Sequence, residues 1–292
     1  MLLHVTPEGT LNGMAHGGNV STEPGLTTGT SRRQGSLPLA FGSGAAIGVL
    51  GGMIGLGGAE FRLPLLISVF GFVALQSVIL NKAMSLVVVA VALPARLLGV
   101  PLAEVLPYWP IVVNLLAGSL IGAWLGATWA TRMRSATLYR VLAALLVVIA
   151  VLLMATHLGT VGTVSLPPAG QVIAGVVAGI VIGVVASFMG VAGGELLIPT
   201  IVLLYGVDIK IAGSLSLAVS LPTMLVAFAR YSRDQSFQVL RANTNFVLAM
   251  SAGSIAGTLL GGLLLGVVPS GVLIPLLSLL LIASAVKVWR HD

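Results

Sequence analysis

Two glutamates, Glu60 and Glu195, stand in matching glycine-rich surroundings in a chain that is otherwise poor in charge. The first lies in Gly-Leu-Gly-Gly-Ala-Glu-Phe-Arg-Leu-Pro, residues 55–64, and the second in Gly-Val-Ala-Gly-Gly-Glu-Leu-Leu-Ile-Pro, residues 190–199. A glycine cluster can end one helix and turn the chain, and a proline is tolerated in the first turn of the next helix. Each block therefore predicts a helix that breaks and restarts.

The start of such a restarted helix can bind an anion, because its free amide groups and partial positive charge face the ligand. Broken backbone inside a membrane must be buried in protein or line a watery cavity. We therefore expect the backbone at these turns to bind a negatively charged substrate, through Gly57, Gly58, Ala59, Gly193 and Gly194. The alternative is a packing turn between two close helices.

The two glutamates are themselves functional candidates, because a charge among apolar residues is costly to bury. We expect Glu60 and Glu195 to carry protons that couple to transport. The alternative role is structural: each carboxylate caps the restarted helix or pairs with Arg62. Neither glutamate is expected to contact the substrate directly, since a permanently negative group would repel an anion.

Further polar candidates lie in the segments that follow the two blocks: Lys82 and Ser85 in the first half, Ser214 and Ser216 near Pro222 in the second. A lysine within an apolar segment usually faces the protein interior and is paired, so it either compensates a glutamate or attracts the substrate. The hydroxyls either hydrogen-bond an oxyanion or satisfy backbone freed by the proline. All four are candidate substrate ligands.

Other classes of site have little material in this sequence. The chain has no cysteine, and its four histidines stand near segment ends or in the tails. We therefore expect no disulfide, no metal centre, no cofactor and no Ser-His triad inside the membrane. No Gly-x-x-x-x-Gly-Lys-Ser/Thr loop is present to bind a nucleotide, so transport driven directly by ATP is not expected.

The elements that must position these residues are membrane helices. The chain is 57% hydrophobic and 8% charged, too few charges to cover a soluble globule of 292 residues. Apolar segments fall at about 37–56, 61–75, 77–99, 108–131, 137–157, 170–190, 196–206, 211–230, 244–267 and 270–288. Roughly 20 residues are needed to cross a bilayer, so the second segment of each set of five is too short and is expected to be a half-helix.

An internal duplication is indicated by a shift of 135 residues. The shift lays residues 44–64 over 179–199 with eight identical positions of twenty-one. The same shift places Gly118, Gly122 and Gly126 on Gly253, Gly257 and Gly261. Two blocks with one offset indicate a repeat, and glycines spaced by four residues are typical of close-packing helix faces.

Basic residues predict the orientation, because short cytoplasmic loops are enriched in Lys and Arg. They gather in two loops, with Arg132, Arg134 and Arg140 in the first half and Arg230, Arg233 and Arg241 in the second. This pattern requires an odd number of crossings in each half, so the second copy is inverted and both termini are cytoplasmic. We expect a disordered cytoplasmic tail (1–36), a first transmembrane repeat (37–157), a linker (158–169) and a second repeat (170–292).

The expected fold class is therefore an all-α integral membrane protein with two inverted-topology repeats of about five segments, the first two in each repeat short or broken. Such repeats with interrupted segments are typical of transporters whose substrate site lies near the midplane of the bilayer. The net charge of +6 forms no run or stripe, so nucleic acid is not an expected partner, whereas the bilayer and a small anion are. The alternatives are an intramembrane enzyme and a non-transporting membrane partner, and the sequence leaves a homodimer open.

The two glycine-rich Glu-x-x-x-Pro blocks and the later glycine rows resemble the TauE/SafE family of the toluene-sulfonate uptake permease superfamily, over about residues 40–288. The resemblance implies a permease of the bacterial inner membrane with seven or eight transmembrane helices, which moves sulfite, sulfonates or related sulfur-containing organic anions. The odd number of crossings per half differs from a simple four-plus-four arrangement. Family members often carry glycine and an apolar residue where Ala59 and Glu60 stand, and Arg62 is unusual.

Overall fold

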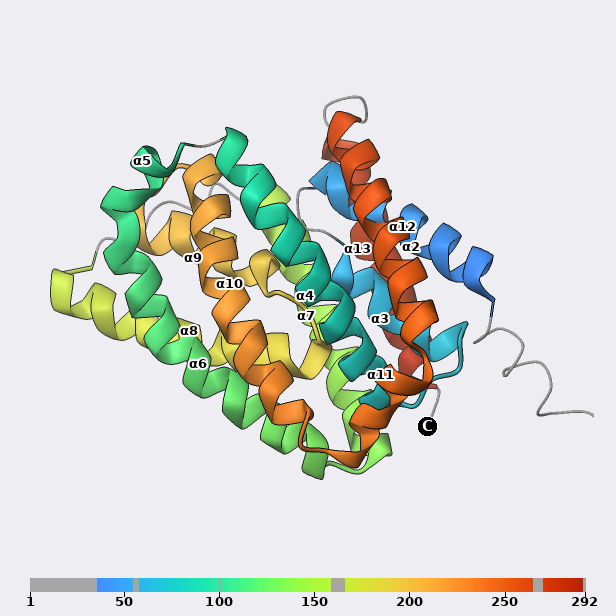
Figure 1. The fold of residues 1–292 in the computed structure, drawn as a ribbon. Coiled ribbons are helices and arrows are strands. Elements are labelled where there is room, and N and C mark those ends of the chain that lie inside the picture. Colours follow the sequence, from blue (N-terminus) through green and yellow to red (C-terminus); the bar gives the residue numbers. More distant parts are fainter. Residues whose placement is uncertain (1–35, 55–57, 100, 159–165, 265–269, 291–292) are drawn as a thin grey trace, which may run out of the picture.

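The computed structural model describes residues 36–54, 58–99, 101–158, 166–264 and 270–290, and within these ranges it contains helices and no strand (Figure 1). Each of the ten apolar segments forms a helix, as predicted. They are α2 (Leu37–Ile54), α3 (Ala59–Ser68), α4 (Ala74–Gly99), α6 (Trp109–Arg132), α7 (Ser135–Leu158), α8 (Pro168–Met189), α9 (Gly194–Tyr205), α10 (Ile209–Tyr231), α12 (Thr244–Leu263) and α13 (Ser270–Trp289). Short turns of helix connect some of them: α5 (Leu102–Val105), η1 (Leu106–Tyr108), η2 (Gln235–Phe237) and α11 (Gln238–Ala242).

The expected tail and linker fall largely outside the described residues: positions 1–35 of the tail and 159–165 of the linker lie there. Within the described chain, six helices are long and apolar enough to cross a membrane. These candidate spans are Ala74–Pro94, Leu102–Arg132, Ser135–Ala155, Pro168–Met189, Ile209–Tyr231 and Thr244–Gly261. Large apolar side chains cover the exterior, as with Ile173 and Leu279, each 66% exposed. The chain is therefore a multi-pass membrane protein.

The second segment of each half is short, as the sequence predicts. Helix α3 has 10 residues and α9 has 12, which corresponds to about 15–18 Å at the rise of an α-helix. The first segments behave differently from one another. Helix α8 has 22 residues and is a candidate span, whereas α2, at 18 residues, counts among the shorter apolar helices.

The shift of 135 residues extends to the helix boundaries. The starts of α3 and α9, α4 and α10, α6 and α12, and α7 and α13 are each 135 positions apart, as are the ends of α2 and α8. This register continues through the stretch between the glycine blocks and the glycine rows, where the two halves share little sequence.

Two helix pairs are packed through glycine, α2 with α12 and α6 with α8. A Cβ atom at Gly44, Gly48 or Gly52 of α2 would collide with backbone atoms of α12, and one at Gly118 or Gly122 of α6 would collide with backbone atoms of α8. Such contact between backbones is open only to small residues. This confirms the predicted close-packing role of the glycine rows. In each pair, the first long helix of one half packs against the fourth of the other.

The helices α6 and α10 run in the same direction. The hydroxyls of Ser119 and Thr223 lie 2.7 Å apart, and Arg230 Nε donates to Thr128 Oγ1 at 2.8 Å, so positions along both helices increase together. Helix α4 runs the opposite way, toward the end at which α6 begins (Figure 1). Helices α4 and α10, which occupy matching places in the two halves, are therefore antiparallel.

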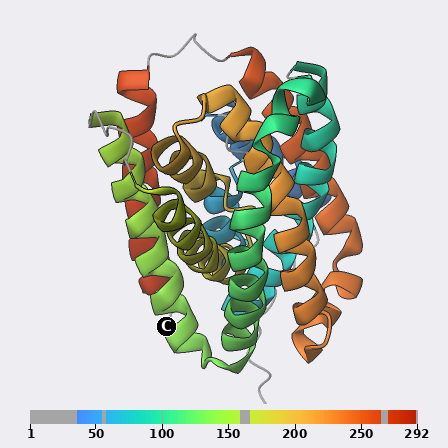
Figure 2. The same ribbon diagram turned by 90° about the vertical axis from the view of Figure 1, so that its left-hand side faces the viewer.

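The basic loops lie at one end of the bundle. Arg230 and Arg233 of the second half both lie over the ring of Trp124, 5.9 and 5.4 Å from its centroid, near the end of α6 where Arg132 stands. At one edge of the molecule α7 and α13 lie side by side (Figure 2).

Candidate functional site

The helix breaks predicted at the glycine blocks are present wherever the structure describes them. Helix α8 ends at Met189 and is followed by Gly190 with φ 68°, and α9 begins after Gly193 with φ 83°. In the first half, Gly58 precedes α3 with φ 71°. These left-handed conformations suit glycine because a Cβ atom would clash with the backbone. Gly57, a predicted ligand, lies outside the described residues.

The two breaks meet at Asn81, in the third turn of α4. Its side-chain nitrogen donates to the carbonyl of Ala59 at 3.0 Å and to the carbonyl of Met189 at 2.9 Å. The first of these carbonyls belongs to the start of α3 and the second to the end of α8. One buried amide therefore ties the glycine block of the first half to that of the second.

Lys82, the next residue of α4, is almost fully buried at 1% exposure, and its ammonium group donates to the carbonyls of Ala186 and Val191, both at 2.8 Å. These carbonyls lie at the negative end of α8, where a cation is favourable. Two of the three ammonium hydrogens are therefore used at the break between α8 and α9, and one is left for another partner.

Arg62 is fully buried and holds three neutral side chains together. Its Nε donates to Asn81 Oδ1 at 2.8 Å, its Nη2 to Ser85 Oγ at 2.8 Å and its Nη1 to Ser254 Oγ at 3.1 Å. A guanidinium has five N–H groups, so two remain unused. Within the described residues, no ion pair shorter than 4.0 Å joins this cation or Lys82 to a carboxylate.

The carboxyl groups of Glu60 and Glu195 lie close enough to interact with each other. Each glutamate is the second residue of its short helix. Glu60 is fully buried, and neither of its carboxyl oxygens has a hydrogen-bond partner; Oε2 of Glu195 is also buried without one. Two carboxyls thus occupy the amide-rich starts of α3 and α9.

The remaining predicted ligands have other contacts. Ser216 donates to the carbonyl of Gly213 at 2.9 Å and Ser214 to that of Lys210 at 3.5 Å, both in their own helix. Neither carbonyl is the one that Pro222 leaves without a donor, which is that of Ala218. Ser85 lies at the guanidinium and not at a glycine turn.

The start of α9 is more open than the start of α3. Gly194 is partly exposed, and a Cβ atom added there would meet nothing within 4 Å. Ala59 and Glu60, by contrast, are buried. A ligand that reaches the cluster therefore has room beside Gly194.

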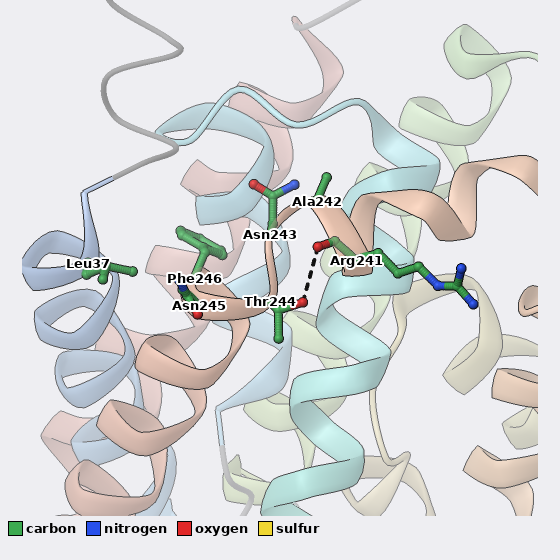
Figure 3. A pocket seen from close by; sticks show the side chains of 7 residues that line it. All are labelled: Leu37, Arg241, Ala242, Asn243, Thr244, Asn245 and Phe246. Carbon is green, nitrogen blue, oxygen red and sulfur yellow. Dashed lines mark hydrogen bonds between the residues drawn. The ribbon is translucent and has the colours of Figure 1, made fainter.

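Two pockets lie elsewhere on the molecule and include none of the four charged residues of the cluster. One, of about 440 Å³, lies where α2 begins and α11 meets α12, and its lining includes Arg241, Asn243 and Phe246 (Figure 3). There Thr244 Oγ1 donates to the carbonyl of Arg241 at 3.2 Å. The other, of about 470 Å³, is an apolar groove between α7 and α13. The buried charges make the helix breaks the better candidate site.

Sequence reasoning proposed no site role for three residues of this cluster: Arg62, which it considered only as a partner of a glutamate, Asn81 and Ser254. The sequence does contain a signal for Ser254. It stands 135 positions after Ser119, so the shift that aligns the two glycine rows also aligns these two serines. Nothing comparable marks Arg62, whose counterpart in the second half is Leu197.

Comparison with known proteins identifies a family for this chain. A protein-family model described as sulfite exporter TauE/SafE matches residues 40–288, nearly the whole chain and both glycine blocks. No curated protein and no solved structure matches the chain significantly. By the extent of the family match, this chain belongs to the sulfite exporter TauE/SafE family.

Proposed function

We propose that the protein is a secondary permease for a small anion, namely sulfite, a sulfonate or a related sulfur-containing organic anion. In this proposal it works by alternating access in the inner membrane of a bacterium, with both termini in the cytoplasm, and it catalyses no chemical reaction. Membership of the sulfite exporter family supports the substrate class.

One observation carries the proposal: two broken helices bring four ionisable groups together inside a membrane protein. Glu60, Arg62, Lys82 and Glu195 all contribute to the junction on α4. Charges inside a membrane protein are costly and mark pathways for ions and substrates. A packing turn alone needs none of them.

The arrangement of the helices supports inverted repeats, with residues 37–157 and 170–292 as the two copies. Helices α4 and α10 are antiparallel, and the basic loops of the two halves lie at the same end of the bundle. In transporters with inverted repeats, the substrate site lies between the copies, and one copy rocks against the other.

The substrate would lie between the starts of α3 and α9. There it would contact backbone amides at Gly58, Ala59, Gly193 and Gly194, together with the unused N–H groups of Arg62. The free ammonium hydrogen of Lys82 and the hydroxyl of Ser85, with Ser214 and Ser216 further away, complete the proposed ligand set.

Reconstitution into liposomes tests this function. Uptake of radiolabelled sulfite, sulfoacetate and methanesulfonate is measured against protein-free liposomes, with unlabelled anion inside to drive exchange. Saturable exchange of at least one of the three is expected, and it should be lost in Asn81→Ala, which unties the two breaks. The matched control is Asn114→Ala, because Asn114 bonds only the Tyr205 hydroxyl, away from the cluster. Absence of exchange for every anion would count against transport.

A further inference from the structure

The carboxyl groups of Glu60 and Glu195 lack hydrogen-bond donors. The two neighbouring cations, by contrast, already have acceptors. Arg62 and Lys82 donate to five oxygens between them, all neutral. Both oxygens of Glu60 and one of Glu195 are buried with no donor. Buried polar atoms in native proteins are nearly always satisfied, so this pair requires a hydrogen that the surrounding side chains do not supply.

The position of the pair matters as much as its missing donors. The two carboxyls stand at the starts of α3 and α9, the partially positive ends at which an anionic substrate would bind. Two ionised carboxylates at these ends would repel an approaching anion strongly in surroundings of low dielectric constant. Protonation of one carboxyl halves the negative charge at these ends and so weakens that repulsion.

The charge of the cluster leads to the same requirement. With both glutamates ionised, the two carboxylates balance Arg62 and Lys82, and the cluster is neutral. Entry of a monovalent anion would then leave one uncompensated negative charge inside the membrane protein, which is costly. Uptake of one proton restores neutrality.

No other charge faces the pair from the described parts of the neighbouring helices. Among the elements packed on α3 and α9, α2 and α8 carry no charged residue, and α4 supplies Lys82. Lys210 of α10 and Lys287 of α13 are exposed, and Arg230, in the last turn of α10, donates to Thr128 of α6. In the described chain, no third acidic or histidine side chain joins the two glutamates to form a metal site.

We propose that Glu60 and Glu195 form a proton-binding pair that must take up one proton before a monovalent anion binds, so that anion and proton cross the membrane together. This rests on the proposed function and specifies its coupling ion. The proton comes from water on the side that faces the substrate, adds to one carboxylate oxygen, and is shared with the other carboxyl as an O–H···O hydrogen bond. It returns to water on the opposite side when the anion leaves.

Methanesulfonate is a suitable probe because it stays ionised throughout the working pH range, so any pH dependence belongs to the protein. For the wild type in detergent, affinity is measured by calorimetry at a series of pH values. Linkage to one proton predicts a fall of about tenfold in affinity per pH unit on the alkaline side. Glu60→Gln and Glu195→Gln, which keep the side-chain shape, should each flatten this dependence. Glu104→Gln should keep it, because Glu104 is exposed on α5, outside the cluster.

A second measurement needs no variant. Binding of methanesulfonate to the wild type in weak buffer should take up one proton per anion, read from a pH indicator dye. Binding without proton uptake would overturn the proposal, as would an unchanged pH dependence in both glutamine variants or a strict requirement for sodium. If no anion binds or exchanges at all, the proposed function itself is wrong.

Discussion

The carboxyl groups of Glu60 and Glu195 lie close to each other, although 135 residues separate them in the chain. Each stands second in a short helix that follows a left-handed glycine. The packing of the two halves thus brings together two helix starts of the same kind, each with a glutamate at its second position. The supporting residues around them are not duplicated, because Arg62 and Lys82 both belong to the first half.

Replacing Arg62 with leucine, the residue at the matching position of the second half, should destabilise the protein. It removes a cation that interacts electrostatically with Glu60 and leaves Asn81, Ser85 and Ser254 without their donor. Each buried acceptor left without its donor costs about 1–3 kcal/mol. Thermal unfolding in detergent measures the loss. The loss of stability in the double variant Glu60→Gln/Arg62→Leu should be smaller than the sum of the losses in the two single variants. A loss equal to that sum would show that the two charges are independent.

Replacing Asn81 with alanine should lower both stability and exchange, because two carbonyls and the guanidinium lose their common partner. Each buried group left unpaired costs about 1–3 kcal/mol. Asn114→Ala loses a single bond, to Tyr205, and should cost less and leave exchange intact. Equal effects of the two substitutions on exchange would argue against a special role for Asn81.

Glycine substitutions test the packed helix pairs. Gly48→Ala and Gly122→Ala place a methyl group against backbone atoms of α12 and α8, and overpacking of this kind costs about 1–3 kcal/mol. Gly42→Ala is the matched control, because a Cβ atom at Gly42 meets nothing within 4 Å. Melting temperature and yield of monodisperse protein should fall for the first two variants only. A tolerated methyl group at both buried positions would mean that these helices are less closely packed.

The orientation can be tested by cysteine labelling, since the chain has no cysteine of its own. Single cysteines are introduced at four exposed positions: Ser135 and Ser232 at the basic end of the bundle, and Ala103 and Ala169 at the other. In intact cells whose outer membrane is permeable to an impermeant maleimide, Ala103→Cys and Ala169→Cys should react. The other two should react only after the inner membrane is opened. The result would contradict inverted repeats if labelling depended on the half of the sequence in which a cysteine lies and not on the end of the bundle.

The elements of the fold were predictable because their signals are local. Runs of apolar residues set the ten helices, and glycines at every fourth position marked the faces that bring backbones together. The breaks at Gly58 and Gly193 could also be predicted, since a positive φ in so short a connection favours glycine.

The site was less predictable, because its contacts join residues that are distant in the sequence. The bond from Arg62 to Ser254 spans 192 positions and exists only because α12 packs beside α4 and α2. The bonds of Lys82 to the end of α8 have the same origin. A buried lysine and arginine predict that partners exist, but the sequence does not say that these partners are neutral oxygens.

Helix α2 packs against α12 and helix α6 against α8, so each half covers the glycine face of the other. A chain of half this length would have no fourth helix of the opposite copy against which to press the glycines of its first. It could bury that surface only by associating with another copy of itself. In the present protein the two halves bury these glycine faces against each other, and both cations of the cluster, Arg62 and Lys82, stand in the first half.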